Sequence, residues 1–250
     1  MRTAAILPLV LSLAAAEAAA QELPFAPGES CTYRGSNRLG RIGTGTMAVE
    51  AGGTMQGRST YLLRFDFAGR VGVFGIHDRS RSWFDPRGLR AYRYTKHERS
   101  PVTSRDEDVT MRPATRRWED AGGEGGAMTT DQPLDELSFI YFIRTLPLED
   151  GDSYSLARHF DTSRNPVRVR VVGRSTMTVP AGSFRTVQVE MRVRDPHRYR
   201  GEGVIQFHLT DDDRRIPVRI ESSIPQAGRM VLSLESGRGG CDAARLARAP

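Results

Sequence analysis

The sequence has little lysine and no long apolar segment beyond its first residues. Of 36 basic residues only Lys96 is lysine, and the arginines are interleaved with 30 acidic residues without forming a basic block. A net charge of +6 spread in this way does not indicate a nucleic-acid-binding protein, and favours at most a weak attraction to anionic lipid head groups or lipopolysaccharide. No stretch after residue 20 approaches the roughly 18 apolar residues of a transmembrane helix. We therefore expect peripheral membrane contact at most.

The start of the chain has the form of a secretory signal peptide. Arg2 precedes an apolar run over residues 4–16, and residues 18–20 are alanines that suit signal peptidase. The run is too short for a permanent membrane helix, and the lack of a cysteine at the cleavage point argues against a bacterial lipid anchor. We expect residues 1–20 to be removed, and residues 21–250 to form one β domain in the periplasm of a Gram-negative cell.

Cysteine is scarce as well. Cys31 and Cys241 stand near the two ends of the expected mature chain. In an oxidising compartment such a pair is expected to be bonded, and closing so long a loop would contribute up to about 5 kcal/mol. Two free thiols are the alternative. Neither cysteine has a second cysteine or a histidine close by in sequence, so we predict no metal or redox site.

Alternation of apolar and polar residues, which is the period of a β-strand, dominates the rest of the sequence. The clearest runs are residues 61–67, 167–171, 187–194, 216–221 and 230–234. Turn-forming residues separate such runs at 85–88, 180–183 and 211–215. One apolar and one polar face are typical of antiparallel sheets. We predict a mostly β fold, with a large antiparallel curved sheet or an open or spiral β-barrel and one short mid-chain helix. Pro217 should lie on an edge strand or begin a strand.

The mid-chain helix is predicted from a change of period. Apolar residues recur at helical spacing at Leu134, Leu137, Ile140, Tyr141 and Ile143. Pro133 suits the first turn of this helix and Pro147 ends it, which gives about three turns. The glycine-rich residues 121–126 are predicted to be a flexible loop. We expect the helix to pack on, or to plug, the curved sheet. Two β lobes are the alternative to one closed unit, which the cysteine pair favours.

Four ordered landmarks extend over most of the expected mature chain. They are PFAPGE at 24–29, DELSFIYFIRTLPLEDGD at 135–152, VPAGSFRT at 179–186 and FHLTDDDRRIPV at 207–218. Together they resemble a family of proteobacterial exported proteins of unknown function. Phe207 stands where members often carry tryptophan, and the cysteine pair is not general in that family. The resemblance implies a periplasmic, largely β protein, similar in architecture to lipoprotein carriers and envelope-integrity proteins, and it supplies no catalytic residue.

No catalytic or metal-binding motif stands out. Ser183 lacks the Gly-x-Ser-x-Gly context of a nucleophile elbow, and Ser138 has no histidine nearby in sequence, so turn and helix-surface roles are expected for them. His208 with Asp211 and Asp213 is the best local set of metal ligands, but a strand histidine beside an acidic turn is the simpler interpretation. We expect that turn to be locked by an ion pair with the arginines that follow it. We predict no catalytic residue, no metal and no cofactor.

The functional hypothesis depends on apolar side chains. The mid-chain helix is apolar nearly all round, which predicts burial, either as core packing or as one wall of a hydrophobic cavity. The candidate cavity residues are Phe65, Phe67, Trp83, Tyr92, Leu137, Ile140 and Tyr141. We hypothesise a non-enzymatic protein that binds an apolar or amphipathic envelope ligand, or an envelope protein partner, and supports envelope integrity. The alternatives are an envelope hydrolase whose site is assembled from residues distant in sequence, and a scaffold that only docks other proteins.

Overall fold

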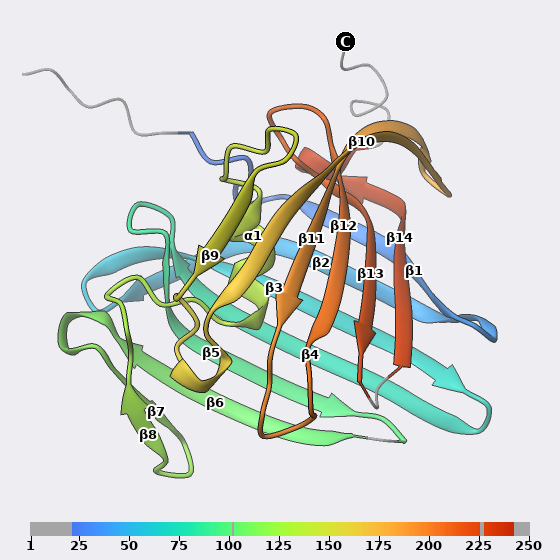
Figure 1. The fold of residues 1–250 in the computed structure, drawn as a ribbon. Coiled ribbons are helices and arrows are strands. Elements are labelled where there is room, and N and C mark those ends of the chain that lie inside the picture. Colours follow the sequence, from blue (N-terminus) through green and yellow to red (C-terminus); the bar gives the residue numbers. More distant parts are fainter. Residues whose placement is uncertain (1–21, 102, 226–227, 243–250) are drawn as a thin grey trace, which may run out of the picture.

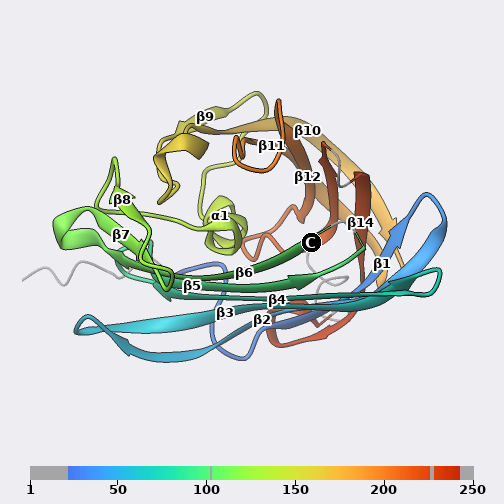
Figure 2. The ribbon, with the colours of Figure 1, turned by 90° about the horizontal axis from the view of Figure 1, so that it is seen from below.

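One curved antiparallel sheet encloses one short helix (Figure 1; Figure 2). The computed structural model describes residues 22–101, 103–225 and 228–242. The expected signal segment, residues 1–20, lies outside these ranges. The predicted fold class, a large antiparallel curved sheet with a short mid-chain helix, is confirmed.

The sheet has fourteen strands. The first eight are β1 (Ser30–Asn37), β2 (Gly40–Met55), β3 (Arg58–Val71), β4 (Phe74–Asp85), β5 (Arg90–Arg99), β6 (Ser104–Arg112), β7 (Arg117–Asp120) and β8 (Gly125–Ala127). After helix α1 (Glu136–Ile143) come β9 (Ser153–Leu156), β10 (Val167–Val179), β11 (Gly182–Val193), β12 (Gly203–Thr210), β13 (Pro217–Ile224) and β14 (Gly228–Arg238). Three short 3-10 helices are η1 (Pro113–Thr115), η2 (Thr162–Arg164) and η3 (Gly239–Cys241).

The sheet consists of two meanders joined by the first and last strands. The order is β8-β7-β6-β5-β4-β3-β2-β1-β14-β13-β12-β11-β10-β9, so β1 and β14 are neighbours in its middle and β8 and β9 are its free edges. Cys31 on β1 forms a disulfide with Cys241 in η3, which confirms the predicted bond. β13 begins at Pro217, where the missing N–H costs no ladder hydrogen bond.

Helix α1 is shorter than predicted. It spans eight residues, which is about two turns. Asp135 is the N-cap: its carboxylate accepts hydrogen bonds from the N–H groups of Leu137 and Ser138, and the Ser138 hydroxyl accepts one from the Asp135 N–H. This capping box sets the helix start, so the prediction that Pro133 lies in the first turn was wrong.

The glycine-rich segment at 121–126 is only partly a loop. β8 begins at Gly125 and pairs with β7, with Gly126 opposite Trp118. A Cβ atom on Gly126 would lie 2.9 Å from the Trp118 indole nitrogen, so the missing side chain makes room for that ring. The prediction of a flexible loop across the whole segment was therefore wrong at its C-terminal end.

The inner face of the curved sheet has two unlike halves. On β10 to β14 and β1 to β3 the inward side chains are apolar, as at Leu63, Val169, Val187, Phe207 and Leu234. On β4 to β6 many are polar or charged, as at Ser82, Lys96 and Glu107. α1 lies inside the curve, between β2–β6 and β9–β12 (Figure 2). No helix in the described part of the chain has the length and apolar character that crossing a bilayer requires.

Candidate functional site

The C-terminal end of α1 carries a buried arginine, Arg144, that holds the N-terminal segment. Its side chain is 1% exposed and that of its partner Glu29 is 4% exposed. Nη1 and Nη2 of Arg144 donate to the two carboxylate oxygens of Glu29 at 2.6 and 2.8 Å. Nη2 also donates to the carbonyl oxygens of Pro24 at 2.7 Å and Arg214 at 2.9 Å. Burial would lower the pKa of Arg144, but Glu29 outweighs it and raises that pKa.

Aromatic rings complete this contact. The Arg144 guanidinium lies 5.2 Å from the ring centre of Phe25 and 5.5 Å from that of Tyr141. The two rings meet edge to face at 5.1 Å. Such cation–π and edge-to-face contacts each contribute about 0.5–2 kcal/mol. Arg144, the C-cap of α1, therefore joins the backbone hydrogen bonds between Gly28, Glu29 and Val49 in fixing this segment over one end of the curved sheet.

A pocket of about 720 Å³ opens at this end of the sheet. Three of the four landmarks contribute to its walls: the segment at 24–29, Arg144 with Thr145, and the turn at 213–215. Leu23, Pro24 and Pro27 offer carbon surface, while Gly239 and Gly240 of η3 carry no side chain that would fill the pocket. The volume lies within the roughly 300–1,000 Å³ that is typical of small-molecule sites.

The acidic turn between β12 and β13 forms one wall of the pocket, and the predicted ion pair is present. Asp212 accepts hydrogen bonds from the Thr210 hydroxyl at 2.6 Å and the Arg214 guanidinium at 2.7 Å. Burial would raise the pKa of Asp212, but these partners lower it. Arg215 has a positive φ of 49°, and its Nη1 is buried without a hydrogen bond, 3.9 Å from the nearest oxygen of Asp211.

The possible metal ligands do not form a metal site. Among the described residues, His208, Asp211 and Asp213 are not brought within ligand distance of one another. Asp211 instead lies close to Arg174 and Arg185. Glu29 does lie beside Cys31 and Cys241, but sulfurs joined in a disulfide offer no thiolate, and both Glu29 oxygens bind Arg144.

The N-terminal end of α1 holds a second charged cluster, centred on Glu136. Its carboxylate lies 2.7 Å from Arg164, 3.0 Å from Arg105 and 3.6 Å from Lys96. The three cationic side chains are 11% exposed, whereas Glu136 is 31% exposed. Burial would raise the pKa of Glu136, but Arg105, Lys96 and Arg164 lower it well below its usual value. Burial would lower the pKa of Lys96, but Glu136 and neighbouring carboxylates raise it to about 12.

Polar atoms without partners surround this cluster. Glu107 Oε2, both carboxylate oxygens of Asp195 and His159 Nε2 are buried without a hydrogen bond in the described structure. Asp195 still lies 3.2 Å from Arg164, as an ion pair with poor hydrogen-bond geometry. Burial raises the pKa of Glu107, and the nearby Glu136 adds to that rise. This end of the enclosed space is therefore polar, and several of its buried polar atoms lack a hydrogen bond within the described residues.

A serine, a histidine and an aspartate also meet, on the exposed segment around η2. Ser163 Oγ lies 3.2 Å from His197 Nε2 and donates to Asp161 at 2.7 Å. Asp161 lies 3.7 Å from the same nitrogen of His197. In a hydrolytic triad the acid and the nucleophile contact opposite ring nitrogens of the histidine. His197 is also 68% exposed, so this arrangement departs from that of a triad.

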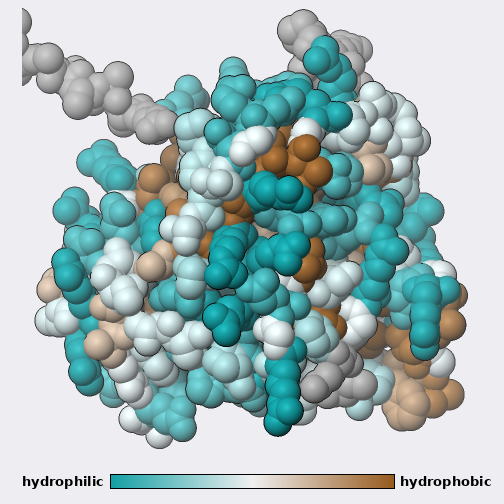
Figure 3. Space-filling view, viewed as in Figure 1, coloured by the Kyte–Doolittle hydropathy of each residue, from teal (hydrophilic) through white to brown (hydrophobic). Residues whose placement is uncertain are grey.

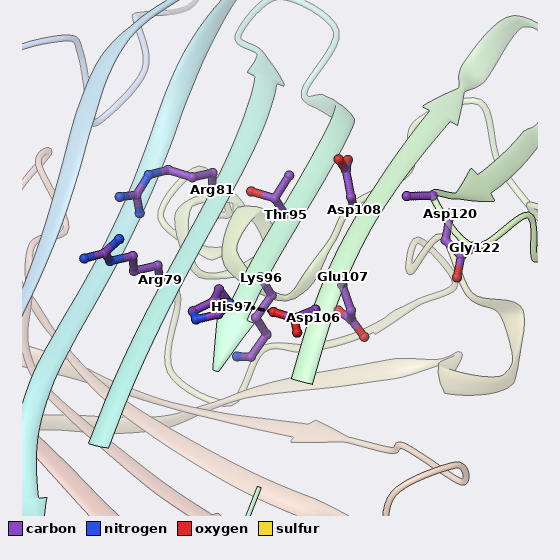
Figure 4. Close-up of a pocket in the computed structure, with 11 residues that line it drawn as sticks. Arg79, Arg81, Thr95, Lys96, His97, Asp106, Glu107, Asp108, Asp120 and Gly122 are labelled. Carbon is purple, nitrogen blue, oxygen red and sulfur yellow. Dashed lines mark hydrogen bonds and ion pairs between the residues drawn. The ribbon is translucent and has the colours of Figure 1, made fainter. Parts of the chain in front are cut away.

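The outer face of β4 to β6 carries a polar recess of about 550 Å³ (Figure 4). Lys96 and Glu107 point inward, so Thr95, His97, Asp106 and Asp108 project from the opposite face. These outer charges mostly pair with one another: Asp106 with His97 and Arg99, and Asp108 with Arg93. Hydrogen bonds from Arg99 and then His97 lower the pKa of Asp106. Exposed pairs of this kind contribute little, and the recess has no apolar wall to hold a ligand.

The seven candidate cavity residues do not share one surface. Phe65 and Phe67 lie on β3 against Gly35, Gly43 and Gly45, toward the end of the sheet away from Arg144. Leu137 and Tyr141 are buried in the core and Ile140 is half-buried.

Two of the seven lie elsewhere. Trp83 projects from the outer face, because its neighbour Ser82 bonds to Asp135 inside, and the Arg93 guanidinium lies 5.1 Å from its ring. The Tyr92 hydroxyl contacts Asp85 at 3.4 Å.

Arg144, Glu29 and Glu136 were not predicted as site residues. One signal was available for the first: Arg144 is a charged residue that directly follows an apolar helix inside a landmark. Its partner stands 115 residues earlier in the chain, and no local pattern connects them.

Comparison with known proteins supplies a family and a fold. A family model described as "Protein of unknown function (DUF3108)" matches residues 32–235. A β-barrel-like protein of the domain of unknown function DUF1849 from Brucella abortus has a similar structure, with a TM-score of 0.53, 12% identity, and coverage of 85% of this chain and 97% of that one. At this identity the likeness concerns the fold alone.

Two further solved structures match less well. A candidate exported protein with a YmcC-like fold from Bacteroides fragilis has a TM-score of 0.37 and 14% identity over 87% of this chain and 98% of that one. A candidate lipoprotein from Parabacteroides distasonis has a TM-score of 0.30 and 11% identity over 86% and 97%. These scores are too low to support an inference. Comparison with curated protein sequences gives no significant match.

Proposed function

We propose that this chain, which belongs to the DUF3108 family of proteins of unknown function, is a non-enzymatic periplasmic protein that binds an amphipathic ligand of the cell envelope. One observation carries the proposal: carbon surface and arginine side chains border the same pocket of about 720 Å³ at the Arg144 end of the sheet. Ligand pockets typically combine apolar walls with a few polar groups that orient the ligand.

The lining of the pocket favours an amphiphile with an anionic or hydrogen-bond-accepting head. Leu23, Pro24 and Pro27 would contact its hydrocarbon part. Arg215 borders the pocket and its side chain is 21% exposed, so it would offer a charged donor to an acceptor group. Arg144 would not bind the ligand, since its guanidinium already donates to Glu29 and to two carbonyl oxygens.

The envelope setting of the proposal is supported by two features of the chain. Its first 20 residues have the pattern of an export signal, and the Cys31–Cys241 disulfide is a bond that persists in oxidising compartments. An amphipathic ligand in that compartment would most simply be a lipid or a lipid precursor.

Titration with a dansyl-labelled fatty acid, competed by lysophosphatidylglycerol, tests the proposal. We expect Arg215→Gln to weaken binding at least tenfold, because a charge-assisted hydrogen bond contributes about 1.5–3 kcal/mol. Arg192→Gln, on the exposed part of β11, is the matched control and should bind as the wild type does. Native mass spectrometry of the purified protein should show lipid adducts. Protein that is free of lipid and does not bind the probe would contradict the proposal.

A hydrolase acting on envelope polymers is the second candidate, and the contact of Ser163 with His197 is the observation in its favour. Ser163→Ala and His197→Gln separate the two functions. A hydrolase would lose turnover of an ester substrate in both variants. The ligand-binding proposal expects no turnover in the wild type and unchanged binding of the probe in both variants.

A further inference from the structure

Two neighbouring hairpin turns carry the most exposed large apolar side chains of the described chain. Val73 is 79% exposed, Leu39 is 74% exposed and Phe74 is 59% exposed. Leu39 lies in the β1–β2 turn, Val73 lies in the β3–β4 turn, and Phe74 is the first residue of β4. Isolated exposed apolar residues are common on soluble proteins, but several gathered at one place mark an interaction site.

The two turns lie side by side. β2 and β3 are paired with Gly43 opposite Gly69, so the hairpins that begin and end there project from the same end of the sheet. Figure 1 and Figure 2 both show them together at the right of the molecule. Figure 3 shows an apolar area at its lower right, at the place that the β3–β4 hairpin occupies in Figure 1. We call Leu39, Val73 and Phe74 the apolar tip.

Arginines without partners flank the apolar tip. Arg38 directly precedes Leu39, and Arg70 lies at the end of β3 before the second turn. Both side chains are exposed, and neither makes a hydrogen bond or an ion pair with the described residues. Several other exposed arginines are paired with carboxylates, as Arg168 is with Glu202. Segments 37–42 and 70–76 contain no acidic residue, so this end of the sheet is locally cationic.

We infer that the apolar tip inserts into the interfacial region of an anionic phospholipid membrane, with Arg38 and Arg70 on the lipid phosphates. Apolar side chains beside cationic ones are the composition of segments that lie about 5–10 Å into the head-group boundary. Each arginine near an anionic surface increases binding about fivefold at low salt. A hairpin suits this role because its strands keep their backbone hydrogen bonds while the turn enters the interface.

This site is distinct from the proposed ligand pocket. β1 runs from Ser30, next to the pocket, to Asn37, next to the tip, which separates the two by about 25 Å along the strand. The occupant is a membrane rather than a protein, because three projecting side chains offer far less than the roughly 800 Å² that each partner contributes to a stable protein interface. Binding at the tip would turn the polar, Glu136 end of the enclosed space toward the bilayer.

Co-sedimentation with phosphatidylglycerol–phosphatidylethanolamine vesicles tests the inference. We expect the wild type to sediment with these vesicles at low salt but not with phosphatidylcholine vesicles. Val73→Ser with Phe74→Ser should reduce binding at least tenfold, because two apolar side chains no longer enter the lipid. Arg38→Gln with Arg70→Gln should reduce it about 25-fold and remove most of the salt dependence.

Val172→Ser is the matched control, since Val172 is an exposed apolar residue on β10, away from the tip, at 44% exposure. It should bind the vesicles as the wild type does. All variants should keep the wild-type melting temperature, because the changed side chains are exposed. Equal sedimentation of the tip variants and the wild type would overturn the inference. Failure of the wild type to bind, with self-association that Phe74→Ser abolishes, would identify a second copy of the chain as the occupant instead.

Discussion

The two ends of helix α1 both place charged side chains inside the curved sheet, but in different states. At the C-terminal end Arg144 and Glu29 are sealed from solvent, and every nitrogen of the guanidinium donates a hydrogen bond. At the N-terminal end Glu136 faces three cations and remains partly exposed, with unsatisfied acceptors around it. The sealed pair fixes one chain segment in one position. The open cluster keeps a polar surface that water can reach.

Both ends place a charge that the helix dipole favours, and they differ in how far that charge is removed from water. An acid at a helix N-terminus and a base at its C-terminus both interact favourably with the helix dipole, and α1 has Glu136 and Arg144 in those places. A charge withdrawn from water requires a complete set of partners, whereas a charge that keeps some hydration does not. We therefore expect stability to depend more on the sealed end than on the open one.

Breaking the sealed pair should have the largest effect. Arg144→Met leaves the Glu29 carboxylate buried without its partner, and we expect a loss of about 3–5 kcal/mol in the free energy of unfolding. Urea denaturation followed by circular dichroism measures it. The double variant Glu29→Gln with Arg144→Met should recover much of the loss, because no uncompensated charge remains. A loss below 1 kcal/mol in the single variant would show that this end is not sealed in solution.

The disulfide should come next, since it fastens the same end of the sheet. Cys31→Ser with Cys241→Ser opens a loop of 210 residues, and we expect a loss of about 2–4 kcal/mol. Thermal unfolding of the variant, beside wild-type protein with and without reductant, measures it. Reduced wild type and the serine variant should agree. If both melt like the oxidised protein, the residues around Glu29 and Arg144 hold this end together without the covalent bond.

At the open end, His159 should make stability sensitive to acid. Burial, helped by Arg164, lowers the pKa of His159 to about 3, below its ordinary value of about 6.5. The neutral ring is favoured in the folded state, so its contribution is complete above about pH 6.5 and is lost as the pH falls toward 3. Between pH 7 and pH 5 this amounts to about 2 kcal/mol.

His159→Asn keeps an acceptor for the Asp161 N–H and removes the titration. We expect the difference in unfolding free energy between wild type and variant to shrink by about 2 kcal/mol from pH 7 to pH 5. Parallel pH profiles would mean that His159 is hydrated in the folded state.

Neutralising the centre of the open cluster should have the smallest effect. Glu136→Gln keeps the shape and the hydrogen bond from Tyr94 but leaves three cations without their shared anion. Because the side chain is partly hydrated, we expect a loss of about 1–2 kcal/mol at pH 7. The wild-type pKa of Glu136 is lowered, so this contribution is present above about pH 4.5 and disappears as the pH falls below it. A loss of unfolding free energy as large as that of Arg144→Met would show that water does not reach the cluster.

Features that depend on local pattern could be predicted from the sequence. The alternating runs became strands. The turns predicted at 85–88, 180–183 and 211–215 lie at the β4–β5, β10–β11 and β12–β13 connections, and the acidic turn formed its ion pair. The charged inner wall could not be predicted. Lys96 and Glu107 point inward although their charge alone would predict solvent. Lys96 pairs with Glu136 of α1, which also binds Arg164 of η2, and both α1 and η2 lie far along the chain. Likewise, only the fold brings Glu29 to Arg144.

The pairing of β1 with β14 has a consequence for how the molecule is made. β1 gains its second neighbour only when β14, the last strand, has formed. A chain that is made and exported from its N-terminus therefore cannot complete the sheet before residue 238 is available. A circular permutant that begins after β8 and links the region of Cys241 to that of Leu23 would be one uninterrupted meander, from β9 to β14 and on from β1 to β8. Its lower contact order should make it fold faster than the natural chain.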